Sequence, residues 1–168
     1  KKNKWQDNVL GILVMLLISV PSFVYSFLLQ YVFAFKLGWL PATRADFNGS
    51  WFSGDMFVSM ILPVISMSFG SIAGYARYTR AELTEVLTSD FMLLARTKGL
   101  TKKQAIVRHA LRNAMVPIVP SILAEFIGIL GGSMILERLY SIPGIGGLFL
   151  DALTAKDYNI VFVNMAIF

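Results

Sequence analysis

The chain of 168 residues has no cysteine, a single histidine and few charged residues. Without cysteine it can form neither a disulfide nor a thiolate metal site. The histidine, His109, belongs to no HExxH motif or other ligand cluster, and no nucleophile or orienting acid lies near it, so packing or an interfacial hydrogen bond is favoured over catalysis. The phosphate-binding pattern GxxxxGK[ST] is absent as well. We therefore expect no metal, cofactor or nucleotide site in this chain.

Apolar residues make up 56% of the chain and charged residues only 15%, a ratio that one soluble core of this size would not hide. A helix needs about 20 apolar residues to cross the hydrocarbon core of a membrane. Residues 9–35 and 56–76 are uncharged, and residues 114–136 carry one charge, Glu125. A fourth apolar stretch covers residues 158–168. Residues 1–168 are thus predicted to form an all-α, polytopic membrane helix bundle of about four spans, the last truncated, from the middle of a longer protein.

The distribution of lysine and arginine predicts the orientation. With a cytoplasmic amino end, eleven basic residues face the cytoplasm: Lys1, Lys2, Lys4, Arg77, Arg80, Arg96, Lys98, Lys102, Lys103, Arg108 and Arg112. The outer side then holds Lys36, Arg44, Arg138 and Lys156. This asymmetry follows the positive-inside rule. Residues 77–113 are therefore expected in the cytoplasm and residues 36–55 and 137–157 in outside loops. The net charge of +5 reflects this topology better than nucleic-acid binding.

Local rules divide the polar segment 90–113 into two helices. Ser89 or Asp90 can cap a first helix, and Gly99 supplies the left-handed residue that ends it. Thr101 with Gln104 three residues later is typical of a capping box, which would open a second, basic helix. Two interpretations stay open from the residues alone. The segment is either a lever that passes force from a partner to the next span or a solvated basic loop that only sets the topology.

Three ordered strings indicate a family. ARTKGL at residues 95–100 and RHALRNA at 108–114 resemble the cytoplasmic EAA signature of ABC importer permeases, in the form of the B-type membrane subunits of oligopeptide and dipeptide permeases. ERLYSIPGIGGL at 137–148, followed by DA at 151–152 and KDY at 156–158, is similar to the family's ExxFxxPGxGxL…DAxxxRDY region. GWLP at 38–41 is the third match. Leu93 stands in place of the signature's glutamate, so docking would depend on the shape of residues 91–99 with Arg96 and Lys98.

The resemblance implies the transmembrane domain of a type I ABC importer in the bacterial inner membrane. Such a subunit is not itself an enzyme. It would pair with a homologous second permease, bind two ATPase subunits that hold ATP and Mg, and receive an oligopeptide or dipeptide from an extracytoplasmic binding protein, surrounded by membrane lipid. One alternative is a permease for nickel or another small solute, and another is a channel or secondary carrier without an ATPase. A membrane enzyme has little support, because the sequence places no pair of an acid and a base, and no cluster of metal ligands, on one face.

Three groups of residues are candidates for function. Coupling to the ATPase is assigned to a set in the cytoplasmic segment: Asp90, Leu94, Ala95, Arg96, Lys98, Gly99 and Leu100. An outer gate or a contact with the binding protein, or else a purely structural turn, is assigned to Glu137, Pro143, Gly144 and Gly146. A carboxylate in mid-span is costly, so Glu125 is expected either to line the translocation pathway or to hydrogen-bond between helices.

Overall fold

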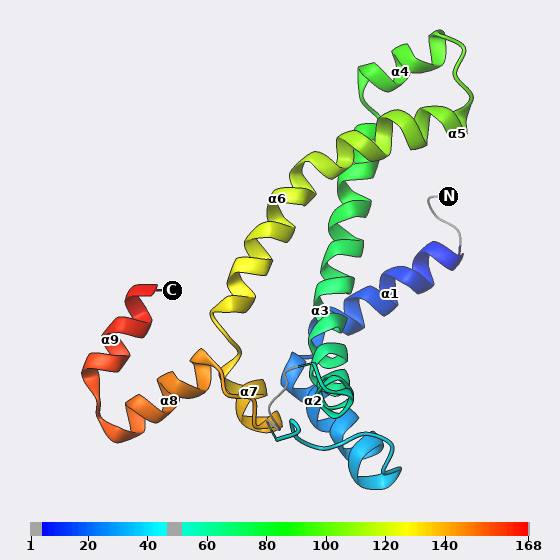
Figure 1. Cartoon of the computed structure of the whole chain (residues 1–168). Helices are drawn as coiled ribbons and strands as arrows, with labels where there is room; N and C mark the ends of the chain where they lie inside the picture. The colour runs from blue at the N-terminus through cyan, green and yellow to red at the C-terminus, as the bar shows by residue number, and fades with distance from the viewer. Residues whose placement is uncertain (1–4, 47–51, 168) are drawn as a thin grey trace. The chain divides into compact units, whose positions relative to one another are not determined.

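The computed structural model describes residues 5–46 and 52–167, without the side chains of Arg96 and Ile167. Every regular element in this part of the chain is a helix (Figure 1), as predicted. The cations at positions 1, 2 and 4 and the last residue of the predicted fourth span lie outside the described residues. The chain divides into two compact units. The first consists of Lys1–Ser19 and Ser71–Glu125, and the second of Val20–Gly70 and Phe126–Phe168.

The first unit contains α1 (Trp5–Ser19), the second half of α3 (Gly54–Leu87) and the polar segment. That segment begins with α4 (Asp90–Thr97) and continues with α5 (Lys102–Ala105), the π-helical turn η2 (Ile106–Ala110) and α6 (Leu111–Leu130). The last three form one uninterrupted helix, Lys102–Leu130. Arg80 of α3 pairs with Asp7 of α1 at 2.7 Å. Figure 1 shows α4 and α5 turned back beside the carboxyl end of α3.

The second unit contains α2 (Ser22–Leu29), the π-helical segment η1 (Gln30–Lys36), the first half of α3, α7 (Met134–Tyr140), α8 (Ile145–Ala155) and α9 (Tyr158–Ile167). Its core is formed by Leu62, Leu136 and Tyr140, against which Phe23 and Phe33 pack. The Tyr140 hydroxyl donates to the carbonyl of Ser26 at 3.3 Å, so this fully buried side chain is satisfied. The unit is thus held by one apolar cluster whose members come from three parts of the sequence.

Among the described residues, two helices are long and apolar enough to cross a membrane, Gly54–Leu87 and Lys102–Leu130. A third crossing is counted if α1 and Ser22–Lys36 form one broken span. The break lies at Pro21, the N-cap residue of α2. Proline lacks the N–H that a continuous helix would need there, so a new helix begins after it. Pro63, by contrast, lies inside the continuous helix α3. The exact boundaries of the spans and their sidedness stay predictions.

Helix α3 continues eleven residues past the predicted span 56–76, to Leu87. At 1.5 Å per residue this extension is about 16 Å long. The helix Lys102–Leu130 likewise begins twelve residues before the predicted span start at 114. Both helices therefore extend well beyond the predicted hydrocarbon core, and α4 is attached between their ends.

Candidate functional site

The turn after α4 forms as local chemistry predicts. Gly99 has φ +81°, and the N–H of Leu100 donates to the carbonyl of Ala95 at 3.4 Å, the long bond of a Schellman motif. The N–H of Gln104 donates to Thr101 Oγ1 at 3.3 Å, and the N–H of Thr101 donates to Gln104 Oε1 at 3.0 Å, which completes the predicted capping box. The hydroxyl of Ser89 donates instead to Val86 at the end of α3. Two helices joined at Gly99 are thus confirmed.

One face of α4 is packed. Met92 and Ala95 are buried in a cluster with Ala105 of α5 and Ala110 of η2. Leucine and valine side chains from the end of α3 and the turn surround this cluster: Leu83, Val86, Leu87 and Leu100. Three alanines let the helix backbones approach closely, so α4 is fixed to both helices that extend from the predicted membrane. Of the predicted coupling residues, Ala95 is buried in this cluster and Leu100 packs against it, half-buried.

A second face of α4 is exposed and mainly apolar. Leu94 is 56% exposed and Phe91 three residues earlier is 40% exposed, while Lys98 four residues later is also on the surface. Residues at this spacing share one face of a helix. Asp90 and Gly99 are exposed at its two ends, and the side chain of Arg96 lies outside the described residues. A rigid helix with such a face can dock into a groove of another protein.

Glu125 forms a contact between helices. Its carboxylate accepts a hydrogen bond from the Ser71 hydroxyl of α3 at 2.5 Å and a second from the side chain of Tyr75. Ser71 and Tyr75 lie four residues apart on one face of α3, a pattern of hydroxyls opposite a mid-span acid that sequence analysis could have noticed. These donors satisfy the carboxylate, which explains how an acid is tolerated in an apolar helix.

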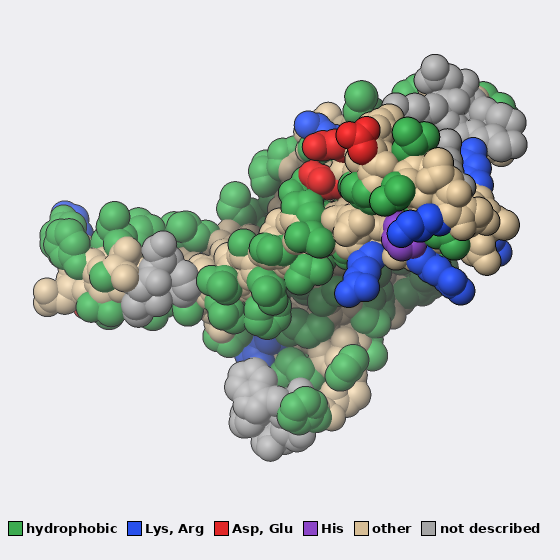
Figure 2. All heavy atoms as spheres, turned by 90° about the horizontal axis from the view of Figure 1, so that it is seen from above, with side chains coloured by type: hydrophobic (Ala, Val, Ile, Leu, Met, Phe, Trp, Pro, Cys, Tyr) green, Lys and Arg blue, Asp and Glu red, His purple; other side chains and the backbone are tan. Residues whose placement is uncertain are grey.

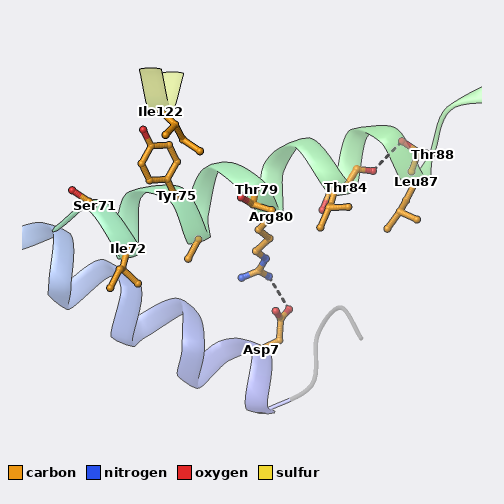
Figure 3. A pocket seen from close by; sticks show the side chains of 12 residues that line it. Asp7, Ser71, Ile72, Tyr75, Thr79, Arg80, Thr84, Leu87, Thr88 and Ile122 are labelled. Carbon is orange, nitrogen blue, oxygen red and sulfur yellow. Dashed lines mark hydrogen bonds and ion pairs between the residues drawn. The ribbon is translucent and has the colours of Figure 1, made fainter. Parts of the chain in front are cut away.

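The same two hydroxyl residues line a cavity of about 930 Å³ in the first unit (Figure 3). Its wall is mainly one face of α3, from Ser71 to Thr88, with Ile122 of α6 and Asp7 of α1. In Figure 3 Tyr75 points towards Ile122, and the pair of Arg80 and Asp7 lies farther along α3. A cavity of this size is in the range of small-molecule sites. The sequence contained no signal for it, because Asp7 and Arg80 are 73 positions apart.

On the other unit, Glu137 caps two helices at once. Its Oε1 accepts from the N–H of Ser133, the N-cap residue of α7, at 3.1 Å. Its Oε2 accepts from the N–H of Gly147 in the first turn of α8 at 2.7 Å. The N-cap residue of α8 is Gly144, which has no side chain with which to cap the helix. One carboxylate, only 9% exposed, therefore satisfies the free N–H groups and partial positive charge at two helix starts.

Glycines make room for this carboxylate. A Cβ at Gly144 or at Gly132 would collide with the Glu137 carboxylate, and one at Gly146 would lie 2.8 Å from the nitrogen of Met134. Gly132 also has φ +80°, which a glycine adopts without strain. The stretch predicted as an outside loop is thus largely helical, and α8 already begins at Ile145. Glu137, Gly144 and Gly146 form one structural junction, and Pro143 lies in its turn.

Arg138 projects to the surface beside this junction. It is paired with Asp151 of α8, and its guanidinium also donates to the carbonyl of Gly147 at 3.4 Å. Arg44 reaches the same place from the segment after η1, where its backbone N–H donates to the carbonyl of Tyr140 at 2.7 Å. Together they border a polar cavity of about 440 Å³. The junction is therefore both packed inside and charged outside.

Comparison with known proteins gives a consistent picture. The family described as "Binding-protein-dependent transport system inner membrane component" matches residues 1–168. The oligopeptide transport system permease protein OppB of Escherichia coli (strain K12) is 41% identical over 96% of this chain and 50% of its own length. The dipeptide transport system permease protein DppB of Lactococcus lactis subsp. cremoris is 38% identical over 100% of this chain and 52% of its own. The glutathione transport system permease protein GsiC of Escherichia coli O1:K1 / APEC is 35% identical over 99% of this chain and 52% of its own length. The chain spans about half the length of these curated relatives.

Proposed function

The chain belongs to the family of binding-protein-dependent transport system inner membrane components, and from this premise we propose that it is a transmembrane subunit of an ATP-driven peptide importer. It forms half of a translocation pathway for oligopeptides or dipeptides, and a homologous permease forms the other half. Two ATPase subunits bind ATP and Mg, and an extracytoplasmic binding protein delivers the peptide. Relatives described as oligopeptide and dipeptide permeases support this choice of substrate.

The observation that carries the proposal is the build of α4. The helix presents Phe91, Leu94 and Lys98 on an exposed face, while Met92 and Ala95 fix it to its neighbours. A docked ATPase subunit would therefore move α4 together with the ends of α3 and α5, because all three share one buried cluster. Closure of the ATPase dimer is transmitted along α3 and Lys102–Leu130 into the membrane. A solvated loop that only set the topology would need neither this cluster nor a rigid exposed face.

Inside the predicted membrane, we assign Glu125 to a hydrogen-bonded pair of helices that borders the pathway. Ser71 and Tyr75 both hold its carboxylate and line the cavity of about 930 Å³. A change in the relative position of α3 and α6 would alter these bonds and the cavity together. Replacement of Glu125 by glutamine should therefore change peptide uptake, and unchanged affinity, uptake and selectivity would remove this role.

Co-purification tests the docking surface. Leu94→Ser removes an apolar side chain from the proposed docking face, and Leu93→Ser makes the same chemical change on the neighbouring face, where Leu93 is 63% exposed. We expect Leu94→Ser to retain several-fold less ATPase on the purified subunit, while Leu93→Ser retains more. Thermal unfolding of both variants should match the unchanged protein, because neither side chain is buried.

The outcomes separate the alternatives. If no ATPase accompanies even the unchanged protein, the chain acts as a channel or secondary carrier and the proposal is wrong. If the ATPase is present and survives Leu94→Ser, docking occurs elsewhere. Mass spectrometry of the ligand on the co-purified binding protein distinguishes a peptide from nickel or another small solute.

A further inference from the structure

A basic patch lies where the helix Lys102–Leu130 approaches the predicted membrane. Arg108, His109 and Arg112 are all exposed, and Lys102 and Lys103 lie farther along the same helix. Figure 2 shows lysine and arginine side chains gathered around the histidine and separate from the acidic side chains. The sequence contains no Asp or Glu from Phe91 to Ala124. In the described part of the chain neither arginine is paired with a carboxylate.

Arg112 lies at the depth of the headgroup layer, and Arg108 lies just outside it, within reach of its long side chain. Arg112 precedes the predicted span start at Ala114 by two residues and Arg108 by six, or about 3 Å and 9 Å along the helix axis. The polar layer of a bilayer is roughly 5–7 Å thick on each side of the hydrocarbon core. Arginine side chains also extend along a helix to reach the interface. Lys102 and Lys103, about 16–18 Å from Ala114, lie beyond this layer.

Apolar side chains accompany the two arginines. Val107 is 57% exposed and Leu111 is 42% exposed, and each directly precedes an arginine of the patch. Val107 and Leu111 lie one turn apart, and Arg108 and Arg112 lie one turn apart beside them, so the surface offers cations to phosphate and aliphatic groups to acyl chains. This combination is typical of helix surfaces that lie at a membrane interface. A solvated face that only set the topology would have no use for the exposed valine and leucine.

We propose that Arg108 and Arg112, with Val107 and Leu111, bind the phosphate headgroup of an anionic phospholipid in the cytoplasmic leaflet. The guanidinium groups donate to the phosphate oxygens, and the aliphatic side chains contact the upper part of the acyl chains. The bound lipid stabilises the point at which η2 and α6 enter the membrane. Family membership does not specify this lipid site. The site goes beyond the proposed transport function and shares with it only the expected cytoplasmic location of residues 77–113.

An acidic surface of the ATPase is the competing occupant. α4 packs against Ala110, which lies between the two arginines, so the arginines are close to the proposed docking helix. The exposed Val107 and Leu111 beside them favour lipid, because acyl chains cover such side chains and an acidic protein surface does not. Lys102 and Lys103 lie farther from Ala114 than the arginines do. The lysine pair therefore serves as a matched control, since its replacement removes the same charge at a different distance from the membrane.

Native mass spectrometry of the purified complex in detergent tests the site. Phosphatidylglycerol or phosphatidylcholine is titrated, and bound lipid is counted for three double variants: Arg108→Gln/Arg112→Gln, Lys102→Gln/Lys103→Gln, and Arg108→Lys/Arg112→Lys. We expect the arginine-to-glutamine variant to bind phosphatidylglycerol roughly thirty-fold more weakly, because each of the two lost cations contributes about 1 kcal/mol. The other two variants should stay near the unchanged protein, and phosphatidylcholine should bind equally to all.

Each other result overturns the site. Equal loss in both glutamine variants would show diffuse attraction by net charge, and retained phosphatidylglycerol in the arginine variant would show that lipid binds elsewhere. Loss of co-purified ATPase with lipid retained would assign the patch to protein docking. The lipid count needs no transport activity, so failure of the import proposal leaves this test readable. A thermal unfolding scan in detergent confirms that the variants are folded.

Discussion

At the scale of single residues, Gly99 is where the conformation of the backbone decides the turn. Its φ of +81° lies in the left-handed region, yet a Cβ built there has nothing within 4 Å. A substitution at this position therefore acts through backbone strain and not through a steric clash. Left-handed backbone costs an ordinary residue about 1–2 kcal/mol, a β-branched one more, and asparagine less.

We expect Gly99→Val to uncouple ATP hydrolysis from uptake, because the strained turn would displace α5 from α4 and break the shared cluster. Gly99→Asn is the matched control, since asparagine adopts the left-handed conformation readily. The measurement is the number of peptides taken up per ATP hydrolysed by the assembled transporter in proteoliposomes. Normal coupling in a correctly assembled valine variant would show that the turn geometry is not part of the transmission.

At the scale of elements, the junction of α7 and α8 depends on one buried acid. Glu137→Gln leaves a single carbonyl oxygen for two N–H donors and places an NH₂ group against one of them. We expect a loss of about 2–3 kcal/mol in the free energy of unfolding, because a buried donor is left unsatisfied and the charge at two helix starts is removed. Unfolding of the purified protein in mixed micelles by added SDS measures this change.

The neighbouring ion pair provides the control for that prediction. Asp151→Asn removes the partner of Arg138, but both side chains are more than half exposed, at 64% and 51%. Exposed pairs contribute about 0–1 kcal/mol. Equal effects of the two substitutions would mean that Glu137 stabilises the junction no more than a surface charge does.

The same two elements show what sequence patterns can and cannot predict. Residues 99–104 contain both the turn at Gly99 and the capping box at Thr101, so local rules predicted both. Glu137 accepts a hydrogen bond from the N–H of Gly147, ten residues away. This contact also needs glycine at positions 132, 144 and 146, where a Cβ would collide with neighbouring atoms. The string ERLYSIPGIGGL indicated a family, but it did not show that its glutamate caps two helices. The segment 137–157, predicted as an outside loop, contains the end of α7 and all of α8. Likewise, Ser71 and Tyr75 lie 54 and 50 positions from Glu125, so the two hydroxyls are visible in the sequence but their pairing with the acid is not.

At the scale of the whole molecule, the topology rests on the distribution of charge, and the absence of cysteine makes it directly testable. Lys103→Cys and Ala155→Cys each introduce a single thiol at an exposed position. Lys103 lies at the start of the helix Lys102–Leu130, and Ala155 lies beyond its end. This helix has 29 residues and is about 43 Å long, which exceeds the roughly 30 Å of a hydrocarbon core. The helices α7 and α8 that follow have only 7 and 11 residues, so neither alone is long enough for a second crossing.

One crossing between the two thiols places them on opposite sides of the membrane. We expect a membrane-impermeant maleimide to label Ala155→Cys in intact cells and Lys103→Cys only after the membrane is opened. Labelling in the reverse order would invert the orientation and remove α4 from the reach of a cytoplasmic ATPase. Labelling of both thiols in intact cells would mean that α6 does not cross, or that residues 131–155 return through the membrane. Either result would contradict the proposed coupling path from α4 to α6, because force on the cytoplasmic side could then no longer pass directly along one helix into the span.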